Sequence, residues 1–359
     1  MKALSIYWLL LLCFLPFFQS RAVAQSTSKK ETKSFAAGQI PLIYSSDIFI
    51  PPDDPDDHFD LAAISCIKEL NLKAMVFDMS SPKRTPDEVA VASLKQLNLI
   101  TGMPLPPYAT GLREPLRSPD DKALEQPNEF QGGVELVLST LRKSNEKVVL
   151  FLVGSCRDFA VAFNREPELM RQKVKSVYVN AGNGAAEMQT EWNVELDQLA
   201  YKSLMSSGLP VYWCPCLPDS LRCNSPDEVI AGKAYSTYYI IYNQAEILDS
   251  SSKEFINYFA YAMNRSVEEP LDYIKGAPHS IAKEPRNMWC TAPFLDAAGR
   301  KIYRIGENSY AAYQPIEAQC KGLTDREVEV YRFDNIKIKS IQKVWDEKLK
   351  KTNLMVVLC

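Results

Sequence analysis

The sequence predicts an α/β protein with a mostly parallel central sheet, helices on both faces of that sheet, and a helical C-terminal addition. Apolar segments of strand length alternate with segments of helical periodicity between positions 41 and 213. Strands buried on both faces form nearly continuous apolar runs, and their alternation with helices is typical of parallel sheets. The alternation weakens after position 213, where we expect a largely helical part over 214–325 and a C-terminal strand or helix over 326–359.

Each expected strand is short, apolar and rich in β-branched or aromatic residues. The expected strands are Pro41–Ile48, Leu72–Met79, Lys147–Val153, Val174–Ala181 and Leu209–Trp213, and Glu327–Ile338 alternates like a further strand or hairpin. The first expected helix carries apolar residues at helical spacing, the second has a proline at its first position, and Glu168–Lys173 is expected as a further turn only. The expected helices are Asp57–Leu70, Pro86–Leu97, Gly133–Ser144, Cys156–Asn164, Leu196–Ser207 and much of Lys233–Asn264. Six prolines between Thr101 and Asn128 predict a long loop there.

The bulk composition is that of a globular protein. The chain has 359 residues, of which 46% are hydrophobic and 24% are charged, and its formal net charge is -3. This apolar content is sufficient for a sizeable core. The small negative charge gives no electrostatic case for nucleic acid or an anionic membrane surface as a partner.

The N-terminus has the pattern of a secretory signal peptide. Lys2 precedes an apolar run over Ile6–Leu15, and Ala22-Val23-Ala24 matches the small-x-small cleavage rule. Cleavage would lead to export, to the periplasm or out of the cell, and an uncleaved membrane anchor is the alternative. The expected organisation is a signal peptide over 1–24, a flexible polar spacer over 25–40 and one domain over 41–359.

Export affects how the cysteines are interpreted. Nine cysteines are present, and Cys214, Cys216 and Cys223 cluster in the sequence. In an oxidising compartment, this cluster is compatible with a disulfide that closes a loop. A zinc site is the rival interpretation, but the chain has no Cys-x-x-Cys pair, and neither of its histidines lies near the cluster.

The most informative segment is Asp47–Asp60, which lies between the first expected strand and the first expected helix. It contains six aspartates in 14 residues. Ligand sites in parallel α/β sheets lie beyond the carboxyl ends of the strands, and densely placed carboxylates suit calcium or magnesium. A structural interpretation accounts for part of the pattern, because Asp56 and Asp57 could simply complement the positive end of the helix. That role does not require four more acids.

This segment resembles the N-terminal signature of the inosine-uridine-type nucleoside hydrolases. In that family a strand ends in an aspartate, a short loop follows, and a paired Asp-Asp opens the first helix. Asp47 matches the strand-end aspartate, and Asp54-Pro55-Asp56-Asp57 matches the end of the loop. The resemblance implies that Asp47 is the catalytic base and a metal ligand, that Asp57 is a metal ligand, and that Asp56 binds the sugar. The loop is longer here, with Pro51-Pro52 where glycine is commoner.

Two further segments carry the resemblance. Val153–Ala160 is similar to a strand-to-helix turn whose backbone carbonyl, at the position of Arg157, ligates calcium in the family. Glu191-Trp192-Asn193, followed by Asp197, is similar to a family segment that binds the ribose hydroxyls. The resemblance implies sugar contacts from Glu191 and Asn193, and from Asn183 in the loop before them. Trp192 is either a platform for the sugar or part of the core. Asp197 and Asp158 also fit as acids at the starts of helices.

A late motif of the family is absent. The family carries Met-His-Asp-Pro, whose aspartate completes the metal site and whose histidine protonates the leaving base in some members. The corresponding segment here is 288–293, without a His-Asp pair, so Thr291 or water would substitute as a ligand. The chain has only His58, near the start of the first helix, and His279. A surface position is the common alternative for His58, and a structural role for His279.

The resemblance implies hydrolysis of the N-glycosidic bond of a ribonucleoside or related riboside, with Ca²⁺ as the cofactor and a homo-oligomer as the assembly. The alternative is a catalytically altered or inactive paralogue that acts as a secreted nucleoside-binding or sugar-binding protein. Two other enzyme classes are disfavoured. The chain has no Gly-x-Ser-x-Gly nucleophile motif, and no Gly-x-Gly-x-x-Gly follows the first expected strand.

Overall fold

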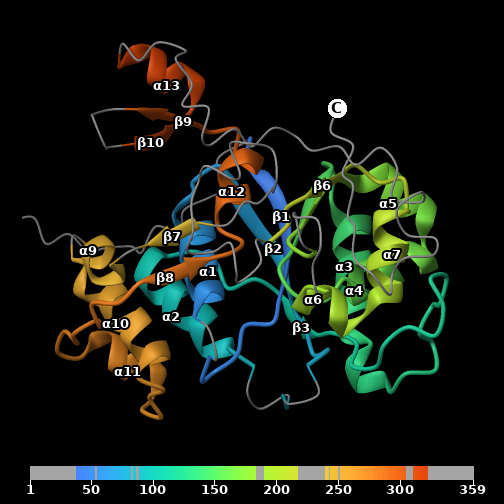
Figure 1. Cartoon of the computed structure of the whole chain (residues 1–359), viewed down its shortest axis with the longest axis horizontal. Helices are drawn as coiled ribbons and strands as arrows, with labels where there is room; N and C mark the ends of the chain where they lie inside the picture. Colours follow the sequence, from blue (N-terminus) through green and yellow to red (C-terminus); the bar gives the residue numbers. More distant parts are fainter. Residues whose placement is uncertain are drawn as a thin grey trace, which may run out of the picture. The chain divides into compact units, whose positions relative to one another are not determined.

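The centre of the protein is a six-stranded parallel sheet with the strand order β3-β2-β1-β4-β5-β6 (Figure 1). The computed structural model describes residues 38–52, 55–81, 84–85, 89–182, 190–216, 239–241, 243–249, 251–304 and 310–321. The strands are β1 (Ile40–Ser46), β2 (Leu70–Phe77), β3 (Tyr108–Thr110), β4 (Val148–Leu152), β5 (Val174–Val179) and β6 (Val211–Trp213). The predicted parallel sheet is therefore confirmed, and β1 and β4 occupy its middle.

Helices cover both faces of this sheet, because alternate strand residues enter two separate apolar clusters. Ile43 belongs to the cluster on one face, whereas Leu42 and Tyr44 belong to the cluster on the other. The first face is covered by α3 (Gly132–Lys143), α4 (Arg157–Arg165), α5 (Pro167–Lys173) and α7 (Gln198–Met205). The second face is covered by α1 (Asp56–Cys66), α2 (Val91–Thr101), α10 (Lys253–Met263) and α12 (Ala292–Ala297) (Figure 1).

Two local expectations from the sequence differ from the structure. The second predicted helix, Pro86–Leu97, corresponds to α2, which begins at Val91. Val89 and Ala90 before it are not helical. The predicted loop over 101–128 contains β3, which pairs with β2 from Met75 to Phe77. This edge strand has only three residues. It is thus too short to show alternation, and the prolines before it hide its pairing.

The chain after β6 combines helices with two pairs of antiparallel strands. These pairs are β7 (Tyr239–Ile241) with β8 (Arg286–Met288), and β9 (Lys301–Arg304) with β10 (Tyr310–Tyr313). The remaining helices of the described part are α6 (Trp192–Leu196), α9 (Gln244–Leu248), α11 (Pro270–Lys275) and α13 (Pro315–Cys320), with a 3-10 turn η2 at Asn128–Phe130. The prediction of a largely helical part over 214–325 did not include the strand pairs.

Several expectations fall outside the described residues. These are the signal peptide over 1–24, most of the spacer over 25–40, the part over 326–359, and Cys223. Within the described part of the chain, none of the helices combines the length and apolar character needed to cross a membrane.

The strand order alone predicts where a ligand site lies. From β1 the chain builds outward to β2 and β3, and it then returns to β4 on the other side of β1. The direction of winding therefore reverses between β1 and β4. In open parallel sheets, ligands bind in the crevice beyond the carboxyl ends of the strands at such a reversal. Asp47 follows β1, and Ser155 lies three residues beyond Leu152, where β4 ends.

Candidate metal centre

Asp47 lies directly beyond the carboxyl end of β1, as predicted from the sequence. Its side chain shares a hydrogen bond with Asp57. Loss of hydration on burial raises the pKa of Asp47 to about 7, and the negative charge of Asp78 acts in the same direction. Asp47 therefore stands among carboxylates that oppose its ionisation.

The paired acids Asp56 and Asp57 open helix α1 and are both buried. Their exposed fractions are 9% and 6%. Pro55 precedes the helix and offers no side-chain cap, so the first-turn acids complement the free backbone N–H groups there. Ser46 Oγ at the end of β1 donates a hydrogen bond of 2.8 Å to Asp57 Oδ2. This contact fixes the start of α1 against the end of β1.

The electrostatic environment of Asp57 is strongly unfavourable to its charge. Burial raises its pKa well above the usual value, and the neighbouring Asp56, Asp47 and Asp60 raise it further. In the described part of the chain, no ion pair joins Asp57 to a lysine or arginine. Buried carboxylates are normally paired with a cation or coordinate a metal. The cluster therefore has the composition of a group that can hold a cation.

A third group completes this cluster. One potential ligand atom each from Asp56, Asp57 and Cys290 lies within 4.8 Å of the other two. Cys290 is only 4% exposed, and it lies between β8 and α12. Cys290 was not predicted as a site residue, although the sequence carries a signal for it. When 288–291 is set against Met-His-Asp-Pro, Cys290 falls at the position of the aspartate.

The predicted ligand Thr291 has a different partner in this structure. Its hydroxyl donates a hydrogen bond to Asp60 Oδ1, and Tyr44 donates one of 3.3 Å to Asp60 Oδ2. Asp60 is fully buried, and burial raises its pKa to about 7. Thr291 thus fixes the segment that carries Cys290 against α1. Its role as a metal ligand stays a prediction.

Asp78 is a buried acid that the sequence analysis did not single out. It follows β2, accepts a 2.5 Å hydrogen bond from the backbone N–H of Ser155, and accepts another of 2.9 Å from that of Ser80. A Cβ atom on Gly154 would lie 2.4 Å from Asp78 Oδ2, so glycine is needed there. The signal was an aspartate at the end of an apolar strand. Asp78 joins the ends of β2 and β4, and its charge raises the pKa of Asp47.

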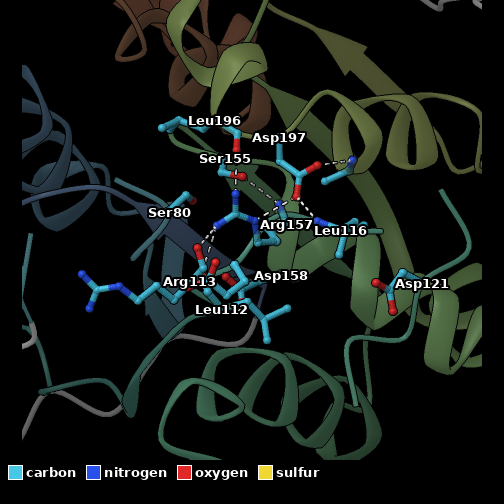
Figure 2. A network of polar contacts seen from close by, with 12 residues as sticks. Ser80, Leu112, Arg113, Leu116, Asp121, Ser155, Arg157, Asp158, Leu196 and Asp197 are labelled. Atoms are coloured by element: carbon cyan, nitrogen blue, oxygen red, sulfur yellow. Dashed lines mark hydrogen bonds and ion pairs between the residues drawn. The ribbon is translucent and has the colours of Figure 1, made fainter. Parts of the chain in front are cut away.

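Arg157 is the first residue of α4, and its side chain is the centre of a buried polar network (Figure 2). Its Nε donates to Asp197 Oδ2 at 2.9 Å, and its terminal nitrogens donate to the carbonyls of Arg113 at 2.5 Å and Leu196 at 2.6 Å. Only a backbone role was predicted for Arg157. The side chain ties the turn after β4 to α6 and to the loop before α3, and the carbonyl as a metal ligand stays a prediction.

The predicted sugar-binding residues near α6 have structural contacts of their own. Glu191 caps α6, and its carboxylate accepts hydrogen bonds from the backbone N–H groups of Gly182, Asn193 and Val194. The Asn193 amide donates to the backbone carbonyls of Asn180 and Val153 at 2.9 and 3.2 Å. The predicted sugar contacts stay predictions for Asp56, Glu191, Trp192, Asn193 and Asn183. Asn183 lies outside the described residues.

Three other expectations for this region have clear outcomes. Trp192 is 52% exposed, so the core interpretation is wrong for it. Asp197 is confirmed as a helix-start acid, because its side chain caps α7 by accepting from the Ala200 N–H. Asp158 is confirmed in the first turn of α4, but it is buried, and burial raises its pKa to about 8.

Both histidines pack against tyrosine rings. The surface alternative for His58 is wrong, because it is 1% exposed and faces the ring of Tyr258 at 6.0 Å. Burial lowers the pKa of His58 to about 3, so its imidazole is neutral at physiological pH. His279 has the expected structural role, since it stacks on Tyr273 with ring centroids 4.2 Å apart.

Fold and site together define an α/β protein with a buried acidic cluster at the point where strand order reverses. No family model matches the chain. It is 29% identical over 174 residues to a pyrimidine-specific ribonucleoside hydrolase, RihA, from Enterobacter sp. (strain 638), which covers 44% of this chain and 55% of the relative. The RihA of Citrobacter koseri is 28% identical with the same coverage. The resemblance to nucleoside hydrolases is thereby confirmed, and the chain spans about half the length of these curated relatives.

Solved structures give matches of lower similarity. A plant nucleoside hydrolase is 14% identical, with a TM-score of 0.47 and coverage of 77% of this chain and 88% of that one. The inosine-uridine preferring nucleoside hydrolase of Bacillus anthracis is 14% identical, with a TM-score of 0.45 and coverage of 77% and 91%.

Proposed function

We propose that the protein hydrolyses the N-glycosidic bond of a ribonucleoside or related riboside, with a divalent cation held at the start of α1. The observation that carries the proposal is the buried pair Asp56 and Asp57, fixed beyond the end of β1 at the reversal of strand order. The sequence relationship to ribonucleoside hydrolases supports the reaction class. Because the match covers 55% of the relative, activity and substrate are proposals for this chain.

The donor set at the cluster fits a divalent cation in general. Asp57 and Asp56 supply carboxylate oxygens, and the sequence analysis adds Asp47 as an oxygen donor. When bound, such a cation supplies positive charge that binds sugar hydroxyls and lowers the pKa of a water molecule. The aspartates favour Ca²⁺, as the resemblance implies, whereas the sulfur of Cys290 is not a calcium donor.

The other roles in the hydrolysis belong to side chains of the protein. Asp47 takes the proton from the attacking water, since its carboxylate projects beyond β1 next to Asp57. The sugar gains oxocarbenium character as the base departs, and the negative charges of Asp56 and Asp57 stabilise it. The exposed ring of Trp192 covers the bound sugar from water. The described histidines take no part, so the base leaves without a histidine proton donor, or water supplies the proton.

The test is release of ribose from inosine, uridine and p-nitrophenyl riboside, each with several divalent ions. The proposal expects hydrolysis of at least one substrate that stops when chelator is added. Asp47→Asn should lower kcat by about 100-fold or more while binding persists, because it removes the base without changing shape. The matched control is Asp249→Asn on an exposed turn, which should leave kcat unchanged. Absence of metal-dependent hydrolysis across the three substrates would contradict the proposal.

A second candidate function has its own supporting observation. The protein would be a secreted nucleoside-binding or sugar-binding paralogue without turnover. It is favoured because His58 is buried, with its ring 6.0 Å from that of Tyr258, and because Glu191 accepts hydrogen bonds from three backbone N–H groups. Calorimetric binding of inosine or ribose to a protein that releases no base would establish this function and exclude the first.

Export is a proposal that rests on the N-terminal sequence. The pattern of Lys2, the apolar run and Ala22-Val23-Ala24 supports cleavage before Gln25. The mass of the protein recovered from the periplasm or the medium of an expressing bacterium tests it. A mature N-terminus near Gln25 is expected, and retention of the intact chain in the cytoplasm would contradict it.

A further inference from the structure

Cys290 is the feature of the acidic cluster that the proposed function leaves unexplained. Its sulfur lies within 4.8 Å of ligand oxygens of both Asp56 and Asp57, although 233 residues separate Cys290 from Asp57 in the sequence. The thiol is 96% buried, since its exposed fraction is 4%, and it makes no hydrogen bond to the described residues. A buried thiol without a hydrogen-bond partner, close to two buried carboxylates, has the composition of a metal-ligand set.

The structure holds Cys290 at this place through its neighbours. Thr291 donates a hydrogen bond to Asp60 on α1, and Met288 ends a strand that packs against the same helix. Cys290 and Asp57 thus belong to two elements that are fixed to each other. The packing of these two elements therefore sets the position of the sulfur.

The donor set is unsuited to calcium as the preferred ion. Calcium takes six to eight oxygen ligands, and a sulfur donor contributes nothing to that shell. Thiolate together with carboxylate suits a borderline ion such as Zn²⁺, which accepts sulfur at about 2.3 Å and carboxylate oxygen at about 2.0–2.2 Å. Zinc also needs only about four ligands, which Asp56, Asp57, Cys290 and one water or Asp47 would supply.

We propose that Cys290 is a metal ligand and that it makes the site selective for a thiol-binding divalent ion, represented by Zn²⁺, over Ca²⁺. The proposal rests on the metal site of the proposed function and changes its chemistry. On zinc binding the thiol gives up its proton to solvent, and the sulfur forms the bond to the ion. The site would then be a mixed sulfur and oxygen centre in place of an all-oxygen one.

The experiment uses Co²⁺ as a spectroscopic substitute for zinc, on the full chain after removal of bound metal by a chelator. One equivalent of Co²⁺ should produce a sulfur-to-cobalt charge-transfer absorption in the near ultraviolet. Zn²⁺ should abolish this absorption by displacement, and a large excess of Ca²⁺ should not. Absence of the absorption in the wild-type protein, or its displacement by Ca²⁺, would overturn the proposal without any variant.

Two substitutions and one control assign the absorption to a residue. Cys290→Ser should abolish the absorption and weaken Zn²⁺ binding at least about 100-fold, because loss of a direct ligand exceeds the usual effect of a supporting residue. Cys290→Asp should abolish it and raise Ca²⁺ affinity. Cys214→Ser, at another buried cysteine that is 5% exposed, should leave it unchanged. An absorption that survives Cys290→Ser would refute the assignment.

Hydrolysis of inosine and uridine is measured separately on the same preparations. The sulfur absorption without hydrolysis would support the cysteine ligand and contradict the proposed enzyme. Hydrolysis with Ca²⁺ and without the absorption would support the enzyme and overturn the cysteine ligand. The two proposals therefore fail in distinguishable ways.

Discussion

Substitution of Arg157 by methionine should destabilise the protein severely, because it breaks a buried ion pair from one side. Arg157 and Asp197 have side chains that are each 1% exposed, and their Nε–Oδ2 distance is 2.9 Å. Methionine fills the aliphatic part of the space but leaves the Asp197 charge and two backbone carbonyls without this donor (Figure 2). Removal of one partner of a buried pair typically costs about 3–5 kcal/mol.

The magnitude is large against the total stability of a domain, which is about 5–15 kcal/mol. Urea unfolding followed by circular dichroism measures it as a fall in the midpoint at constant slope. The double substitution Arg157→Met with Asp197→Asn should recover about 1–3 kcal/mol relative to the sum of the single losses, because no uncompensated charge remains. Arg171→Met is the control, since its pair with Glu168 is exposed and is expected to contribute less than about 1 kcal/mol.

The reasoning would be refuted by a loss below about 1 kcal/mol for Arg157→Met, or by strictly additive single and double substitutions. Either result would mean that the Asp197 charge is hydrated or neutral in the folded protein. The guanidinium joins the turn after β4 to the end of α6, so a small loss would mean that this turn keeps its place without that contact.

Asp158→Asn should remove a pH dependence of the free energy of unfolding. Burial raises the pKa of Asp158 from the usual 3.8 to about 8. The protonated acid therefore contributes its full stability below about pH 4, and this contribution is lost as the pH rises towards 8. The stability advantage of the variant over the wild type should therefore grow by up to about 1.4 kcal/mol per pH unit in urea titrations over that window, and a constant difference would contradict the buried neutral acid. Gly154→Ala should lower the free energy of unfolding by about 1–3 kcal/mol, since its Cβ would lie 2.4 Å from Asp78 Oδ2, and an unchanged urea midpoint would show that the turn adapts freely. Asp57→Asn should raise the melting temperature of the metal-free protein by about 2–6 °C at neutral pH and abolish any further rise on addition of a divalent ion; a melting temperature that still responds fully to the ion would exclude Asp57 as a ligand.

The sequence predicted those parts of the fold that depend on local pattern. β1, β2, β4 and β5 are largely apolar segments of five to eight residues, and their presence and their parallel direction were predicted. β3 was missed because three residues carry no period, and its identity depends on pairing with β2. The strands β7 to β10 were missed for the same reason, since each has three or four residues and pairs only within a two-stranded sheet.

The candidate site was predictable to the extent that it lies in one segment. Asp47, Asp56 and Asp57 stand close together in the sequence, and the structure brings them together at the end of β1. Asp78 was missed because sequence does not show that β2 lies beside β1 in the sheet. Cys290 was missed because its distance from Asp57 is set by the packing of β8 and α12 against the sheet and α1. A resemblance that names an absent aspartate does not reveal what its replacement can bind.

The burial of so many acids at one strand end is itself an argument for a bound cation. Burial raises the pKa of Asp47 and of Asp60 to about 7, and the charges of neighbouring acids oppose the ionisation of Asp57. Such groups hold protons in the fold that they lose when unfolded at neutral pH, so without an ion the cluster lowers stability. An ion that binds only the folded chain reverses the sign of this contribution. Cys290 then determines which ion does so, because sulfur distinguishes between cations to which carboxylates bind with little selectivity.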